Sequence, residues 1–395
     1  MRGATQSGCG EGARVLGLSK EATTLTGAQV LWGIGFGLLG TLFPLYLRDL
    51  GATPTDIGLV FGVGNVIAAA SFIPIGLAAD RFGRRPLLIG VWLTSTIGAA
   101  AFLPLTDWRG AFIGSSLYWI GSAALPLMSA HLAALTPRSR LSSELGMVYG
   151  AFFFGTILAA PLAGSIGALV GLRGGIAIAT VAFMLSSALT FRLSRTRPVA
   201  HVPGRPPLPR SFWTLIAITP LAALITTIVN PLFPVYVRDV AAVPLERVGV
   251  YVGLVALGAA LFSAVNGRIA DRFGPVPAVI GAGAVLTLGA GTIALSGRSE
   301  VLLALGSFLL GAQTAPNPVL AGALERVLPP ARAALGYSGF QLVFALGFGT
   351  GGLLSGVLYD TDPLLPMLVQ VALALPLTAT VAVIVARILS SPRAT

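Results

Sequence analysis

Long stretches without a charged residue alternate with short polar segments along this chain of 395 residues. The shortest stretch has 18 residues and the longest 28, whereas every other gap between charges has eight residues or fewer. A helix crosses the hydrocarbon core of a membrane in about 20 residues, and the stretches lack the alternation of a membrane β-barrel. We therefore predict twelve transmembrane helices. They lie within residues 22–47, 57–79, 86–106, 110–137, 145–172, 174–191, 211–237, 248–267, 273–297, 301–324, 333–359 and 363–386.

The composition agrees with this pattern. Hydrophobic residues make up 55% of the chain and charged residues only 10%, with a mean hydropathy of +0.87. Soluble domains carry about 25% charged residues, so this chain cannot cover itself with a water-soluble surface. We expect an all-α membrane protein whose partner over most of its surface is the lipid bilayer.

The basic residues predict the orientation of the chain. An even number of crossings puts both termini on one side, and that side carries 19 of the 25 Lys and Arg residues. The positive-inside rule therefore places both termini in the cytoplasm, for which we expect the bacterial inner membrane. The net charge of +11 is explained by these loops beside anionic lipid, so we expect no nucleic-acid partner. The single Cys9 can form no internal disulfide.

The two halves of the chain repeat each other. Residues 42–50 read LFPLYLRDL and residues 232–240 read LFPVYVRDV, which match at six of nine positions with an offset of 190. The sequence ADRFG at 79–83 returns at 270–274 with an offset of 191. An ordered series of matches at nearly one offset indicates a duplicated unit of six helices.

The duplication predicts four segments. They are a polar cytoplasmic N-terminal segment at 1–21, a six-helix bundle at 22–191, a Pro- and Arg-rich cytoplasmic linker at 192–210 and a second six-helix bundle at 211–390. Two parallel, pseudo-symmetric bundles around a site near the membrane midplane are a transporter design, in which rocking of one bundle exposes the site to each side in turn.

The polar loop after the second stretch carries the most specific motif. It reads Gly-Leu-Ala-Ala-Asp-Arg-Phe-Gly-Arg-Arg from residue 76 to residue 85, and it resembles the cytoplasmic signature G-x-x-x-D-R-x-G-R-R of the major facilitator superfamily. The copy at 267–274 keeps the first part and lacks the paired arginines. Together with the repeat, the resemblance covers about residues 22–390 and is to the drug-exporter-like branch with twelve helices.

The resemblance implies a gating role for this motif. In the family the aspartate faces a helix N-terminus and a nearby arginine, so Asp80 would hold the cytoplasmic side shut in the outward-open state. In the alternative interpretation, Arg81, Arg84 and Arg85 only anchor the topology. The gating residues implied are Gly76, Asp80, Arg81, Gly83, Arg84, Arg85, Gly267, Asp271, Arg272 and Gly274.

Evidence for proton coupling in the sequence is weak. A family pattern similar to R-x-x-Q-G is replaced by Leu-Tyr-Trp-Ile-Gly at 117–121, without the arginine. The exporter motif of the fifth helix is degenerate here, and all 14 acidic residues lie at the ends of stretches or in loops. We interpret His131 as an interfacial residue rather than a proton relay. A proton therefore stays open, and doubtful, as the coupling ion.

Neutral polar and aromatic residues at helical spacing are the candidates for a substrate cavity. A cavity built from them suits a neutral or amphipathic solute, whereas phosphate, carboxylate or peptide substrates favour Arg or Lys. Individual amides and hydroxyls can equally serve to join helices. The candidates are Gln29, Trp32, Phe36, Tyr118, Tyr149, Thr226, Asn230, Gln313, Asn317 and Gln341.

These patterns favour a secondary active transporter of a small, neutral or lipophilic organic solute, first of all a multidrug-type exporter. A carrier of sugars or other neutral metabolites, or a lipid flippase, on the same scaffold is the alternative. No nucleotide-binding loop, metal-ligand cluster or nucleophile arrangement is visible, so we expect neither an enzyme nor a cofactor or metal. We expect the transporter to be a monomer.

Overall fold

The computed structural model describes residues 18–195, 208–314, 316–328 and 333–390, and every regular element in them is a helix. The first half contains α1 (Lys20–Asp49), α2 (Pro54–Phe82), α3 (Arg84–Ala100), η2 (Trp108–Gly110), α4 (Ala111–Ile120), η3 (Gly121–Ala123), α5 (Ala124–Leu135) and α6 (Arg138–Thr190). The second half contains α7 (Arg210–Thr227), η4 (Asn230–Leu232), α8 (Phe233–Asp239), α9 (Leu245–Phe273), α10 (Pro275–Ala294), α11 (Glu300–Leu310), η5 (Gly311–Thr314), α12 (Pro316–Val327), α13 (Ala333–Thr361) and α14 (Leu365–Ser390). The predicted all-α fold is confirmed.

Within the described residues, nine helices are long and apolar enough to cross a membrane. Two of the twelve predicted stretches fall in α6, where Gly171 adopts a φ of 77° and interrupts the helical geometry. The stretch at 86–106 forms α3, which has 17 residues, and the stretch at 301–324 is divided among α11, η5 and α12. Twelve crossings with cytoplasmic termini therefore stay a prediction.

The two copies of ADRFG make the same turn. Gly83 caps the C-terminus of α2 with a φ of 89°, and Gly274 caps that of α9 with a φ of 90°. Glycine adopts such positive φ values without the steric cost that other residues meet. The repeat seen in the sequence is thus also present in the backbone.

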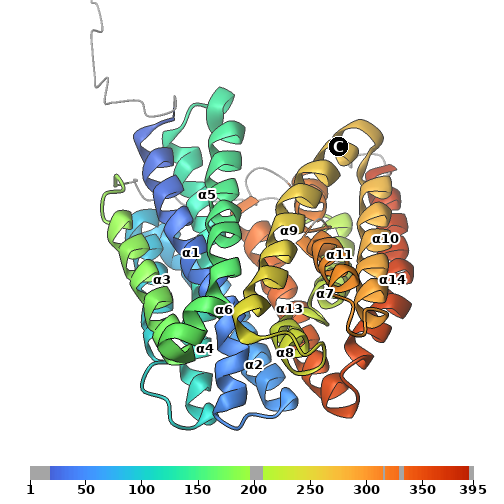
Figure 1. The fold of residues 1–395 in the computed structure, drawn as a ribbon. Coiled ribbons are helices and arrows are strands. Elements are labelled where there is room, and N and C mark those ends of the chain that lie inside the picture. The colour runs from blue at the N-terminus through green and yellow to red at the C-terminus, as the bar shows by residue number, and fades with distance from the viewer. Residues whose placement is uncertain (1–17, 196–207, 315, 329–332, 391–395) are drawn as a thin grey trace, which may run out of the picture.

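The helices form two groups. Figure 1 shows α1 to α6, in blue to green, on one side of the molecule and the later helices, in yellow to red, on the other. The groups meet along two helix pairs, α2 with α13 and α6 with α9. Glycines allow this close approach: a Cβ on Gly58 would lie 2.6 Å from the carbonyl oxygen of Gly352, and one on Gly249 would collide with the carbonyl of Ala160.

The limits of the four predicted segments stay a prediction. Most of the expected linker at 192–210 and nearly all of the segment at 1–21 lie outside the described residues. The described ends of both agree with the change from polar to apolar sequence, since α1 begins at Lys20 and α7 begins at Arg210.

The first half buries charged groups at the end where α1 begins. Glu21 accepts a hydrogen bond of 2.6 Å from the Ser194 hydroxyl and lies 3.1 Å from Nε2 of His131. Glu144 accepts a hydrogen bond of 2.7 Å from the hydroxyl of Ser19. The ring of His131 is fully buried within the protein, and its interpretation as an interfacial residue rather than a proton relay stays a prediction. These bonds join α1 to α5 and α6.

Candidate functional site

A cavity of about 110 Å³ lies between the two helix groups, beside the middle of α1. Helices of both halves line it, so it lies where a transporter of this architecture would hold a solute. The lining residues are Phe36, Gly37, Leu39, Gly40, Phe43, Phe61, Phe102, Ser115, Tyr118, Trp119, Thr156, Asn230, Pro231, Val252 and Phe348.

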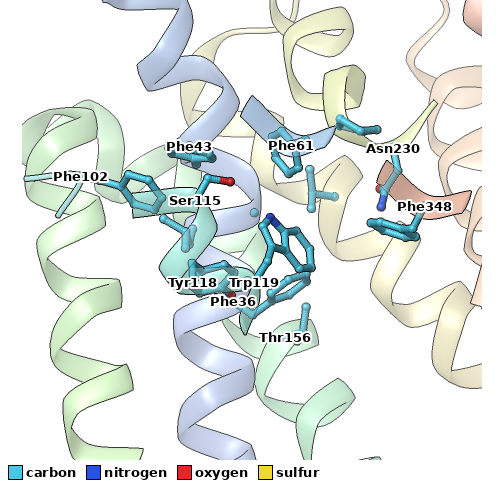
Figure 2. A pocket seen from close by; sticks show the side chains of 15 residues that line it. Phe36, Phe43, Phe61, Phe102, Ser115, Tyr118, Trp119, Thr156, Asn230 and Phe348 are labelled. Carbon is cyan, nitrogen blue, oxygen red and sulfur yellow. The ribbon is translucent and has the colours of Figure 1, made fainter. Parts of the chain in front are cut away.

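Aromatic residues are the largest group in the wall, with seven of the fifteen lining residues (Figure 2). The rings of Phe43 and Phe102 are 4.2 Å apart between centroids, and Phe43 and Phe61 are 5.8 Å apart. Trp119 of α4 and Phe348 of α13 lie 5.9 Å apart, which makes a ring contact across the two halves. Rings at such distances attract each other beyond their buried area, so the wall is held in shape by its own contacts.

Two of the three hydroxyl groups of the wall are already bonded inside the protein, whereas that of Tyr118 makes no hydrogen bond within the described part of the chain. Ser115 donates to the carbonyl of Val60 at 2.9 Å, and Thr156 donates to the carbonyl of Phe152 at 2.9 Å. The side-chain amide of Asn230, in contrast, makes no hydrogen bond within the described part of the chain, and Figure 2 shows it at the side of the cavity beside Phe348. Among the described residues, no acidic or basic side chain belongs to the lining. The cavity therefore offers one amide, the hydroxyl of Tyr118 and several aromatic rings to a solute.

A break in the backbone positions Asn230. Helix α7 ends at Thr227, and α8 begins at Phe233 after the short η4. Pro231 has no N–H group, so the helical hydrogen-bond ladder cannot continue through it. Carbonyl groups freed in this way can line a site where they are buried in the protein.

Three of the ten residues predicted for the cavity line it: Phe36, Tyr118 and Asn230. Trp32 lies behind the wall, with its ring 4.5 Å from Phe183 and stacked on Tyr118 at 6.3 Å. The role of each residue in binding stays a prediction.

The other predicted residues lie outside the lining and mostly bond to neighbouring groups. The amide of Gln29 contacts the sulfur of Met128 at 3.6 Å, and the hydroxyl of Tyr149 lies 2.6 Å from that of Ser129. The hydroxyl of Thr226 donates to a carbonyl of its own helix. Three more are buried or half-buried elsewhere: Gln313, Asn317 and Gln341.

Twelve lining residues were missed by the sequence reasoning. Gly40 and Phe43 follow Phe36 at i+4 and i+7, so helical spacing could have found them. The remaining positions are apolar or small residues in apolar helices, where spacing does not distinguish a cavity wall from a packed interface. They are Gly37, Leu39, Phe61, Phe102, Ser115, Trp119, Thr156, Pro231, Val252 and Phe348.

The predicted gating motif at 76–85 begins near the C-terminal end of α2. The close approach of α2 to α13 at Gly58 lies near the other end of the helix. Arg84 donates to the carbonyl of Ala130 at 2.7 Å, and Arg85 donates to the carbonyl of Phe191 at 2.8 Å. These bonds tie the start of α3 to the ends of α5 and α6. The side chain of Asp80 lies outside the described residues, so its latch role stays a prediction.

The second copy of the motif repeats one contact. The guanidinium of Arg81 lies 5.4 Å from the ring centroid of Phe82, and that of Arg272 lies 5.3 Å from that of Phe273. Asp271 is exposed. The family role expected for Gly76 and Gly267 stays a prediction, as does that of the arginines.

Two groups of membrane-crossing helices around a shared cavity define a multi-pass membrane transporter. The chain belongs to the Major Facilitator Superfamily, whose family profile matches residues 25–220 and 215–395. The resemblance recognised in the motif at 76–85 is thereby confirmed.

Relatives and solved structures agree with this assignment. The chain is 25% identical to "Multi-drug resistance efflux pump PmrA" of Streptococcus pneumoniae, over 82% of this chain and 86% of that protein. It is 28% identical to "Multidrug resistance protein MdtG" of Citrobacter koseri, over 62% of this chain and 65% of that protein.

The fold is similar to that of the nucleoside transporter NupG, with a TM-score of 0.71 and 15% identity over 95% of this chain and all of that one. It is also similar to a bacterial homolog of the lysosomal transporter Spinster in an inward-facing, unoccupied conformation. There the TM-score is 0.75 at 15% identity, over 95% of this chain and all of that one. At this identity the likeness concerns the fold alone.

Proposed function

We propose that this transporter exports small, neutral or lipophilic organic compounds by alternating access, as a multidrug-type exporter. The observation that carries the proposal is the wall of the cavity, which combines aromatic rings with one unbonded amide and no charged side chain. A phosphate or carboxylate solute would lose its hydration there without gaining a cationic partner, which costs several kcal/mol. An apolar, ring-bearing solute gains from the same surface.

The names of two relatives support the direction of transport. Both the Streptococcus pneumoniae and the Citrobacter koseri proteins are described as multidrug resistance proteins, the first as an efflux pump. The proposal carries this property over to a chain that shares about a quarter of its residues with them.

The proposal includes the setting of the protein. We propose twelve crossings of a bacterial inner membrane, both termini in the cytoplasm, and a monomer that needs no partner protein. In this arrangement the end of α2 that carries Gly83 faces the cytoplasm, and the ends of α1 and α8 at Asp49 and Asp239 face outward. We name the latter the outer end.

A reconstituted system tests the substrate class. Purified protein in liposomes is given a fluorescent aromatic dye, a neutral sugar or a fluorescent phospholipid, and movement of each is followed. We expect the dye to move faster than in liposomes that carry the Gly249→Val variant, in which the α6–α9 crossing cannot close. Movement of the sugar without the dye would support a metabolite carrier instead, and exchange of the phospholipid between leaflets would support a flippase.

A second arm tests the coupling ion. The same liposomes receive a pH gradient, a membrane potential or neither. Because no carboxylate among the described residues lines the cavity, we expect the pH gradient alone to leave dye movement unchanged. Dye accumulation driven by the pH gradient alone would identify a proton as the coupling ion and contradict this expectation.

A further inference from the structure

A second pocket, of about 350 Å³, lies in the second half between the start of α7 and the end of α14. The two helices pack through a hydrophobic cluster that includes Phe212 and Val385. The pocket shares no residue with the cavity between the halves, so it is a separate site. Its lining residues are Arg210, Ser211, Thr214, Ile384, Arg387 and Ile388.

The polar part of this pocket is suited to an anion. Arg210 and Arg387 come from different helices, and both are exposed. The guanidinium of Arg210 and the hydroxyl of Ser211 make no hydrogen bond or ion pair within the described part of the chain, whereas the hydroxyl of Thr214 donates to the carbonyl of Arg210 at 3.1 Å. No acidic side chain among the described residues lines the pocket. Two guanidinium groups without a carboxylate in the wall are a typical recognition site for phosphate.

The rest of the pocket is apolar and borders the lipid. Ile384 lies three residues before Arg387, further from the helix end. Trp213, next to Thr214, has an exposed fraction of 59%, and Val383 has one of 49%. Tryptophan is enriched where a membrane meets water, and Figure 1 shows α14 at the edge of the molecule. A ligand here meets charge near the helix ends and hydrocarbon further along them, so it should be amphipathic.

We propose that this pocket binds an anionic phospholipid, whose phosphate contacts Arg210 and Arg387 while an acyl chain follows the apolar surface at Ile384. The proposed arrangement puts the start of α7 and the end of α14 on the cytoplasmic side, where anionic lipid attracts basic residues. Free phosphate offers the same charge but no hydrocarbon for the apolar part. The inference rests on the proposed membrane setting and not on export.

A lipid in this pocket joins two helices of the same half. One phosphate that contacts both arginines holds the start of α7 against the end of α14, and α7 leads directly to Asn230 in the cavity wall. A ligand that binds only the folded protein also raises its thermal stability. Because the pocket is separate from the cavity, this binding does not require that lipid is moved across the membrane.

The test measures lipid that stays bound to the full-length protein in native mass spectrometry. Phosphatidylglycerol and phosphatidylcholine with the same acyl chains are offered in equal amounts, and we expect phosphatidylglycerol to be preferred. The double variant Arg210→Gln with Arg387→Gln removes both charges. Each basic residue near an anionic headgroup contributes about a fivefold preference, so we expect the preference to fall by roughly ten- to thirtyfold.

A matched control removes two other arginines from the side that is proposed to be cytoplasmic. Arg192 and Arg195 are exposed, follow α6 and do not line the pocket. Arg192→Gln with Arg195→Gln makes the same change in net charge and should lower the preference by less than about twofold. An equal fall in both double variants, or no preference in the unaltered protein, would overturn the site.

A conservative variant separates loss of charge from misfolding. Arg210→Lys with Arg387→Lys keeps both positive charges and should retain most of the preference for phosphatidylglycerol. A fall as large as that of the glutamine variant would overturn the role of charge in this pocket.

Tryptophan fluorescence gives an independent arm that locates the lipid. Lipids with brominated acyl chains quench only those tryptophans that they touch. The chain has five tryptophans, so the part due to Trp213 is obtained by comparison with Trp213→Phe. We expect brominated phosphatidylglycerol to quench Trp213 more than brominated phosphatidylcholine does. Equal quenching by the two lipids would overturn the site without the use of an arginine variant.

Inorganic phosphate distinguishes the two sources of the anion. An excess of it should leave the quenching of Trp213 unchanged, and complete loss of the quenching would identify a site for free phosphate and overturn the lipid. Because no dye is present in any arm, lipid binding to a protein that moves no dye would contradict the export proposal alone. Dye movement by a protein without the lipid preference would contradict this site alone.

Discussion

The two halves share a scaffold but contribute differently to the cavity. Eleven of the fifteen lining residues belong to the first half and four to the second. Helix α1 passes the cavity without a break and presents Gly40, whereas the position 190 residues later is Asn230, followed by Pro231 and an interrupted helix. Duplication therefore kept the helix order and the contacts at the outer end, while the wall of the cavity diverged.

The difference indicates a division of labour. The first half provides a preformed aromatic wall, whose rings are packed on one another and on Trp32 behind them. The second half provides the amide and the broken helix. Shape would then be recognised mainly by one half and polarity by the other, and four changes test whether that holds.

The largest effect should come from the two helix crossings that join the halves, α6 with α9 and α2 with α13, because each half contributes one helix to each crossing. Gly249→Val puts a branched side chain against the backbone of Ala160, and Gly58→Val does the same at Gly352. Overpacking of this kind costs about 1–3 kcal/mol, so dye transport should fall by roughly five- to hundredfold in both variants. Gly281→Val is the control, because a Cβ there meets nothing within 4 Å. A loss in only one of the crossing variants would show that the halves are not equivalent.

A smaller effect, on the free energy of unfolding, should distinguish the buried Glu144 of the first half from the exposed Glu325 of the second. Glu144→Ala leaves the hydroxyl groups of Ser19 and Thr136 without their acceptor, and should lower the free energy of unfolding by about 1–3 kcal/mol. Glu325 is the control, since it is exposed on α12 of the second half, and Glu325→Ala should change stability by less than about 0.5 kcal/mol. Thermal unfolding in detergent measures both, and equal losses would remove this distinction.

Removing an aromatic ring of the first half should weaken dye binding more than removing a ring of the second half. Trp119→Ala deletes contacts with Phe61 at 6.2 Å and with Phe348 at 5.9 Å, and should reduce dye affinity by roughly two- to tenfold beyond the loss of area. Phe348→Ala removes one ring at the edge and should cost less. Fluorescence titration of the purified variants compares them. A larger loss for Phe348→Ala would reverse the assignment of the aromatic wall.

The smallest effect should be selective. Asn230→Leu removes the one unbonded amide of the wall, so ligands that bond to it should bind roughly two- to tenfold more weakly. Dyes without a hydrogen-bonding group should bind as before, and they serve as the control within the same titration. A uniform loss for all dyes would mean that Asn230 shapes the cavity rather than recognises polar groups.

The helices were predictable because lipid imposes a simple condition on sequence: a crossing segment must stay apolar over its whole length. The same condition makes the residues inside a segment uniformly apolar, so the sequence shows little of the structure within the segment. The change of direction in α6 coincides with the gap at Arg173 between two predicted stretches, but the sequence does not show which of the many nearby glycines makes the turn. For the same reason the division of 301–324 into α11 and α12 was visible only as a pair of prolines.

The cavity was predictable only in part. Residue type and spacing identified Asn230, an amide that follows Thr226 by four residues in an apolar helix. They also selected Gln29, whose amide faces Met128 inside the first half, since spacing defines a helix face but not the neighbour that covers it. The rings of Phe61 and Phe102 were missed because a phenylalanine suits a cavity, a packed core or lipid equally well.

Two ion pairs join the halves at the outer end: Arg48 with Asp239, and Arg238 with Asp49. These pairs have a consequence for how this chain arose. When two identical subunits meet about a two-fold axis, any contact from one to the other is made twice. A half-length ancestor with a single Arg–Asp dipeptide at the end of its first helix would, as a dimer, have acquired both pairs in one step. Fusion of two such genes would preserve them, and later change could then remodel each half's interior independently.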